Sequence, residues 1–211
     1  MKQFLRTGII IACCAVILSN CSAGGNLFEG SGDVGNPRLS GSFNYDKESD
    51  AYRLTGAGTN MWATNDEFFM VWRKVSGNFS LSARIKFEGE GVNAHRKIGL
   101  IIRESLAGDA QYADVCVHGD GLTSLQYREN KGGTTKEVVA SHKAPDYIKL
   151  ERLGNKIIMR TAHGSYPVEI TGEIELAFPE TAYIGLFICS HESDVLETAI
   201  FSNVAYKKLK D

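Results

Sequence analysis

The chain has 211 residues, with 23 Lys and Arg against 25 Asp and Glu and a formal net charge of −2. This mildly acidic balance includes no basic run, which argues against nucleic acid or an anionic lipid surface as the main partner. The length fits one large domain or two small ones, and a chain of this size can bury a full core without disulfides or a structural metal.

The first 20 residues have the pattern of an export signal. Lys2 and Arg6 precede an apolar run from Gly8 to Leu18 that is too short to span a bilayer. The following Leu18-Ser-Asn-Cys21 resembles the cleavage and lipidation box of bacterial lipoproteins, although Asn20 departs from the small residue usual before the cysteine. The resemblance implies that Cys21 becomes the lipidated first residue and attaches the protein to a membrane. An ordinary secretory signal is the alternative, and both place the protein outside the cytoplasm.

The remaining chain is predicted to be a short tether and one domain. Residues 21–29 are small and polar, and residues 30–211 contain no segment with the composition of a linker. No acidic run of the kind that resembles a surface-export signal follows Cys21, so we expect a periplasm-facing anchor in the outer membrane. Cys116 and Cys189 are expected to be buried free thiols rather than a disulfide. The scattered histidines and the lack of a C-x-x-C pair argue against a zinc site.

Past residue 26 the sequence alternates with a period of two and shows no sustained helical period. In 79–87, Phe79, Leu81, Ala83, Ile85 and Phe87 are expected to face the core, and Ser80, Ser82, Arg84 and Lys86 the opposite side. Further strands are predicted at 97–103, 112–118, 122–128, 134–141, 147–153, 156–163, 183–189 and 196–206. Glycine turns separate several of them, as at Gly119-Asp-Gly121 and Gly154-Asn155. Such spacing without helices predicts an all-β sandwich of two antiparallel sheets.

A series of short strings, in order along the chain, is similar to a bacterial module of the concanavalin A-like (laminin G-like) superfamily. They include Gly32-Asp-Val-Gly35, Leu54-Thr-Gly-Ala-Gly58 with Trp62, Lys97-Ile-Gly-Leu-Ile-Ile-Arg103, Gln126-Tyr-Arg128, Ile148-Lys-Leu-Glu-Arg152 and Ile184-Gly-Leu186 with Ser190-His191. The resemblance implies a jelly-roll sandwich that occurs on lipoproteins or beside polysaccharide-degrading enzymes and contacts carbohydrate. Fold analogy alone is a weak warrant for that function.

Strand parity supplies a candidate glycan-binding surface. The core positions of three predicted strands leave five polar side chains facing the opposite way, namely Arg103, Asp114, His118, Gln126 and Arg128. Their planar donors and acceptors suit bidentate hydrogen bonds to sugar hydroxyls or carboxylates. A salt-bridged, solvated face is the competing interpretation. Trp62, Trp72 or Tyr166 could supply an aromatic for stacking, whereas a core role is the commoner one for tryptophan.

Catalysis has less support than binding, and no catalytic residue or cofactor is predicted. The string Glu-x-Asp-x-x-Glu, which the resemblance to glucanases would imply, does not occur, and the pairs Glu88/Glu90 and Glu173/Glu175 are expected to be solvated. A glycoside hydrolase or polysaccharide lyase that uses the same face remains an alternative, as does a structural or protein-interaction module without a glycan site. The resemblance also leaves open a structural calcium ion on loop carboxylates such as Asp33 and Asp194.

Overall fold

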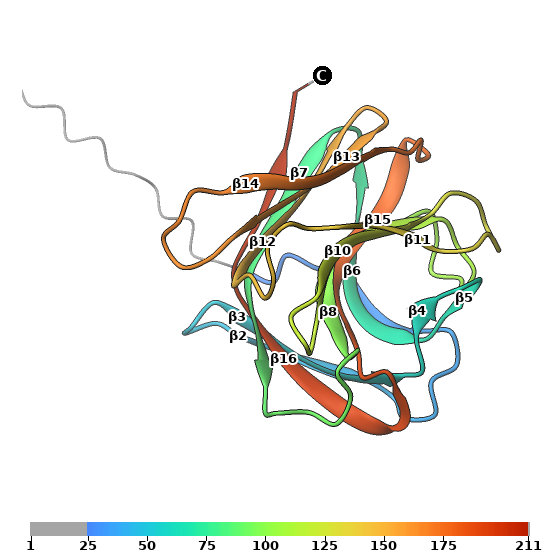
Figure 1. The fold of residues 1–211 in the computed structure, drawn as a ribbon, viewed down its shortest axis with the longest axis vertical. Coiled ribbons are helices and arrows are strands. Elements are labelled where there is room, and N and C mark those ends of the chain that lie inside the picture. Colours follow the sequence, from blue (N-terminus) through green and yellow to red (C-terminus); the bar gives the residue numbers. More distant parts are fainter. Residues whose placement is uncertain (1–24, 211) are drawn as a thin grey trace, which may run out of the picture.

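In a computed structural model, described for residues 25–210, the chain forms two seven-stranded antiparallel sheets packed face to face (Figure 1). Sheet A has the order β1 (Gly30–Val34), β6 (Phe68–Ser76), β15 (Thr181–Cys189), β8 (Lys97–Arg103), β9 (Tyr112–His118), β10 (Thr123–Arg128) and β11 (Lys136–Val139). Sheet B has the order β14 (Glu169–Glu175), β13 (Lys156–Ala162), β12 (Tyr147–Leu153), β7 (Phe79–Glu88), β16 (Glu192–Lys208), β3 (Ala51–Gly58) and β2 (Ser42–Asp46). A short hairpin of β4 (Met61–Trp62) and β5 (Asn65–Asp66) completes the fold.

The main core fills the space between the sheets, because alternate residues of each strand face inward. Phe79, Leu81 and Ile85 of β7 are buried there, as their alternation predicts, and Phe87 packs at its edge. One residue of the opposite set differs from the expectation. Ser80 is buried because it lies between Glu151 and Lys207, its partners on the two neighbouring strands.

A second, smaller apolar cluster lies on the outer face of sheet A, the face turned away from sheet B. Figure 1 shows the β4–β5 hairpin on this side of the sheet. The hairpin contributes Met61 to a cluster that also contains Phe68, Met70, Ile101 and Phe187. The outer face is therefore covered in part rather than open to solvent along its length.

The strands expected in the second half of the chain are confirmed, with small differences at their ends. β8, β9 and β12 have the expected bounds, and the two glycine turns hold Gly121 and Gly154 at positive φ. The structure adds strands that the alternation had not indicated: the six from β1 to β6, and β14. The fold is all-β within residues 25–210, and no helix there is long and apolar enough to cross a membrane.

Two other expectations meet different outcomes. Cys116 and Cys189 are buried free thiols, as expected. Phe28, expected in the tether 21–29, is buried in the main core, and the Leu27 N–H donates to the Tyr52 hydroxyl at 2.7 Å, so these two residues pack on the domain. The proposed signal and Cys21 lie outside the described residues, so the anchor stays a prediction.

Candidate functional site

The five polar residues predicted from strand parity do share the outer face of sheet A. Register places Asp114 beside Gln126, Tyr112 beside both Arg103 and Arg128, and Lys97 beside His118. All five are buried, however, so they neither form a solvated ionic surface nor line one open groove. Arg103 and Arg128 belong to a buried ionic cluster, whereas His118 and Gln126 line a pocket. Asp114 is buried on the same face and is not among the residues that line this pocket.

Arg103 and Arg128 belong to the ionic cluster, with Asp66 of β5 between them. Arg103 Nη1 lies 2.8 Å from Asp66 Oδ2, and Arg128 Nη2 lies 2.7 Å from Asp66 Oδ1. All three side chains are fully buried. The expectation that these arginines line an accessible groove is therefore wrong, because the β4–β5 hairpin lies over them.

Their remaining donors bind the backbone of the loops around the hairpin. Arg103 donates to the carbonyl of Ala107 at 2.6 Å, and Arg128 donates to the carbonyls of Gly133 and Ala63 at 2.8 and 3.2 Å. The two guanidinium groups thus join the hairpin to two neighbouring loops. Their role is to position the hairpin, and with it the adjacent Trp62.

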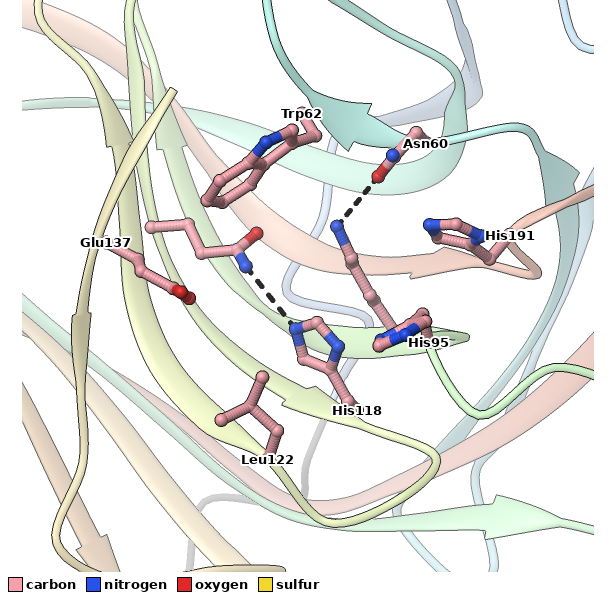
Figure 2. Close-up of a pocket in the computed structure, with 9 residues that line it drawn as sticks. Asn60, Trp62, His95, His118, Leu122, Glu137 and His191 are labelled. Atoms are coloured by element: carbon pink, nitrogen blue, oxygen red, sulfur yellow. Dashed lines mark hydrogen bonds between the residues drawn. The ribbon is translucent and has the colours of Figure 1, made fainter. Parts of the chain in front are cut away.

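A pocket of about 250 Å³ lies next to this cluster on the same face. Figure 2 shows Trp62 and Asn60 on one side, His95 and His191 together, and Glu137 at the opposite side. Its lining residues are Asn60, Trp62, His95, Lys97, His118, Leu122, Gln126, Glu137 and His191. His118 and Gln126 are thus the two members of the predicted set that reach a pocket.

Trp62 is the aromatic residue, among the three considered for stacking on a sugar ring, that lies at this pocket. It is 37% exposed, and its indole lies 5.8 Å from the Lys97 amine. Trp72 packs instead against Gly30, where a Cβ would come within 2.8 Å of the indole. Tyr166 lines a different cavity with His142 and His163. A ligand in this pocket could therefore stack on Trp62, whereas the other two candidates are placed elsewhere.

The floor of the pocket is polar, buried and short of hydrogen-bond partners. Gln126 Nε2 lies 3.3 Å from His118 Nε2, and Lys97 Nζ donates to Asn60 Oδ1 at 2.9 Å. Within residues 25–210, seven buried side-chain atoms have no partner, and five of these belong to the outer face of β9 and β10. The five are both carboxyl oxygens of Asp114, His118 Nδ1, Ser124 Oγ and Gln126 Oε1. Buried polar groups are usually satisfied in proteins, and two of these atoms, His118 Nδ1 and Gln126 Oε1, belong to residues that line the pocket, where a ligand or a water can bind them.

Burial and charge fix the protonation of this floor. Burial, and then the charge of Lys97, lowers the pKa of His118 to about 4. A neutral imidazole whose Nε2 accepts from Gln126 carries its proton on Nδ1, which is then a free donor. Burial also raises the pKa of Asp114, which lies on the same face outside the pocket lining, well above its usual range and favours its neutral acid. His118 Nδ1 and Gln126 Oε1 therefore offer the pocket a donor and an acceptor.

Three histidines surround the pocket, but they do not form a metal centre. The rings of His95 and His118 lie 5.9 Å apart, and those of His95 and His191 lie 5.5 Å apart. No group of three or more His, Cys, Asp or Glu residues in the part of the chain described has the arrangement of a metal site. Asp33, considered for calcium, accepts the Gly41 N–H at 3.0 Å. Calcium binding therefore remains an expectation, for which the described residues show no set of ligands.

Several residues of the pocket were missed by the sequence analysis. Lys97 could have been found, because it alternates with Arg103 along the same strand and must share its face. Asn60, His95 and His191 come from loops, for which alternation gives no information. Asp66 and Asn60 belong to the family-like string around Trp62, but no role was predicted for either. The role of Asp66 depends on the hairpin folding back over sheet A.

Comparison with known proteins identifies the fold. No family model and no curated protein matches the sequence. A functionally unknown protein from Saccharomyces cerevisiae is similar with a TM-score of 0.61 and 11% identity, over 81% of this chain and 97% of that chain. A legume lectin-like domain from Entamoeba histolytica has a TM-score of 0.55 and 12% identity, over 81% and 88%. The carbohydrate-binding module CBM66 from Bacillus subtilis has a TM-score of 0.50 and 16% identity, over 86% and 98%.

These likenesses, together with the two antiparallel sheets, define a concanavalin A-like jelly-roll sandwich. The resemblance inferred from the ordered strings of the sequence is confirmed at the level of the fold. At such identities the likeness concerns the fold alone, so the function has to be argued from the pocket.

Proposed function

We propose that this protein is a carbohydrate-binding or scaffolding domain, without catalytic activity, that takes a glycan in the pocket beside Trp62. The observation that carries the proposal is one pocket lined by the exposed indole of Trp62 and by His118 and Gln126, whose Nδ1 and Oε1 atoms are buried without a partner. Sugars present an apolar ring face beside hydroxyl groups that both donate and accept. An aromatic at the rim and a mixed donor–acceptor floor match those two properties. The lectin-like and carbohydrate-binding neighbours support this class of ligand by analogy.

The lining of the pocket favours binding over hydrolysis. Among the described residues that line it, Glu137 is the single carboxylate, and it lies on the edge strand β11. A retaining glycosidase needs two carboxyl groups about 5–5.5 Å apart, and an inverting one needs a pair separated by about 6.5–9.5 Å. A lyase site with His118 beside a Tyr and an Arg is not formed either, because Arg103 and Arg128 are engaged by Asp66.

A glycan-array screen followed by calorimetry tests the proposal. The sandwich core lies within residues 25–210, so the chain lacking residues 1–21 retains both sheets. We expect Gln126→Leu to weaken binding of an array hit about 10-fold or more while the melting temperature is kept. Tyr166→Ala, at an aromatic that is 75% exposed and lines another cavity, is the matched control and should bind normally. Absence of any glycan hit would favour a structural or protein-interaction module, and new reducing ends on a bound glycan would favour an enzyme.

We also propose that Cys21 anchors the domain in the cell envelope, facing the periplasm from the outer membrane. The support is the basic start, the apolar run and the cysteine of the first 21 residues. Cys21→Ser should leave the protein soluble or unprocessed, since anchoring requires the acyl chains. A variant that still fractionates with membranes like the wild type would contradict the lipoprotein interpretation.

A further inference from the structure

The buried charges on the outer face of sheet A do not balance. The basic groups are Arg103, Arg128 and Lys97, and the acidic groups are Asp66 and Asp114. One positive charge is in excess even if Asp114 is ionised, and two are in excess if burial keeps it neutral. This excess stands out in a chain whose formal net charge is −2.

The positive charge that has no acidic partner is that of Lys97. Its side chain lines the pocket and the residue is only 2% exposed. The amine donates to the neutral Asn60 Oδ1 at 2.9 Å, and within residues 25–210 it forms no ion pair with a carboxylate. An ammonium group has three donors, so two remain for another partner. A buried cation without a counter-ion is costly, which indicates that an anion completes the site.

The neighbours of Lys97 do not supply that anion. Asp114 forms no ion pair with it, and burial raises the pKa of Asp114 well above its usual range in spite of the charge of Lys97. His118 is the register partner of Lys97, and His191 lines the same pocket. Burial first, and then the charge of Lys97, lowers the pKa of both histidines, which favours neutral rings at pH 7. Glu137 lines the pocket from β11, three strand spacings from β8, or about 14 Å across the sheet. Figure 2 shows it on the side opposite His191 and His95. Its charge therefore lies away from the Lys97 end.

We propose that the pocket prefers acidic glycans, with the anionic group of the sugar bound by the Lys97 amine beside Asn60 and Trp62. This inference rests on the proposed glycan binding and assigns its ligand class. The carboxylate of a uronate and a sulfate ester share the required chemistry. The sugar ring lies against Trp62, and its hydroxyls reach the polar atoms of His118 and Gln126.

Matched pairs of oligosaccharides test the preference on the chain lacking residues 1–21. One pair is oligogalacturonate and its methyl ester, and the other is a sulfated oligosaccharide and its desulfated form. We expect the acidic member of at least one pair to bind about 10- to 100-fold more tightly, the contribution of a charge-assisted hydrogen bond. The two pairs distinguish a carboxylate from a sulfate ligand. Raising the salt concentration should weaken the binding of the acidic member and leave the binding of the neutral member unchanged.

Lys97→Met is the decisive variant, and Lys156→Met is its control. Lys156 lies on sheet B in an exposed pair with Glu173, so its loss changes the net charge equally without touching the pocket. Lys97→Met should remove the difference within the pair, whereas Lys156→Met should keep it. Equal binding of acidic and neutral members by the wild type would overturn the inference and leave the proposed function standing. Failure of every array glycan and all four probes to bind would overturn both, and the wild-type comparison decides even if Lys97→Met does not fold.

Discussion

Asp114 lies in the middle of β9 with its side chain fully buried, and burial raises the pKa of its carboxyl group well above the usual range. A carboxyl group whose pKa is raised in the folded state binds a proton more strongly there than in the unfolded chain, whose pKa is about 3.9. Its contribution to stability is therefore lost as pH rises from about 4 through the folded pKa. His118, whose pKa is lowered to about 4, acts in the opposite sense, because its contribution is lost as pH falls from about 6.5 to 4.

The first prediction isolates the effect of Asp114 by substitution. Asp114→Asn removes the ionisable group at nearly constant volume, so the variant should be more stable than the wild type by about 1–2 kcal/mol at pH 8. This advantage should shrink towards pH 4, where the wild-type carboxyl is protonated in both states. Denaturant unfolding at pH 4, 6 and 8 measures it, with the exposed Asp194→Asn as control. An advantage that does not grow with pH would contradict a buried neutral Asp114.

The second prediction concerns the single carboxylate shared by two buried arginines. Asp66→Ala leaves the guanidinium groups of Arg103 and Arg128 buried without a counter-ion, which should cost about 3–5 kcal/mol. Asp109→Ala, which removes an exposed carboxylate 3.8 Å from the Lys131 amine, should cost less than about 1 kcal/mol. Urea unfolding compares the two. A loss of less than about 1 kcal/mol for Asp66→Ala as well would mean that the Asp66 cluster does not stabilise the fold.

At the scale of elements, two adjacent residues of the β4–β5 hairpin have different environments, one in an apolar cluster and one at the pocket. Met61 is fully buried against the outer face of sheet A, whereas the adjacent Trp62 is partly exposed at the pocket. Met61→Ala should therefore cost about 2–5 kcal/mol of stability. Trp62→Ala should change the melting temperature little, yet weaken glycan binding about 10-fold through lost stacking. Thermal melts and calorimetry of both variants test this third prediction, and a large stability loss in Trp62→Ala would show that the indole is mainly packing.

The same hairpin explains where prediction from sequence succeeds and fails. Alternation in β7, β8, β9 and β12 reports which face of a strand meets the main core between the sheets. This was enough to predict the sandwich and the shared face of the five polar residues, but not that the outer face of β8 and β9 is buried as well. Strand β6 contains the run Phe-Phe-Met-Val-Trp, because apolar layers cover both of its faces, and so it shows no alternation. Likewise, the strands of the β4–β5 hairpin have two residues each, which is too short for an alternating pattern to be recognised in the sequence. Since Asp66 and Met61 lie in that hairpin, the cover over the arginines and the limits of the pocket could not be foreseen.

At the scale of the whole molecule, one core joins the two sheets, and this gives a prediction about cooperativity. Phe79 of β7 is fully buried in that core on sheet B, whereas the two tryptophans of the sequence, Trp62 and Trp72, lie on or over sheet A. If the sheets unfold together, Phe79→Ala should lower the free energy of unfolding by about 3–5 kcal/mol. The loss should appear equally in tryptophan fluorescence and in far-ultraviolet circular dichroism, because coincident transitions mark a two-state process.

Phe87→Ala is the matched control for this fourth prediction, since it removes the same ring from the end of the same strand. Phe87 is only partly buried, under the Arg96 guanidinium at 4.2 Å, so fewer contacts and less apolar area are lost. Phe87→Ala should therefore lower the free energy of unfolding clearly less than Phe79→Ala does. If fluorescence reported an unchanged transition in Phe79→Ala while circular dichroism shifted, sheet A and its hairpin would unfold independently of sheet B. The pocket would then belong to a separately stable layer, and its residues could be replaced without reference to the main core.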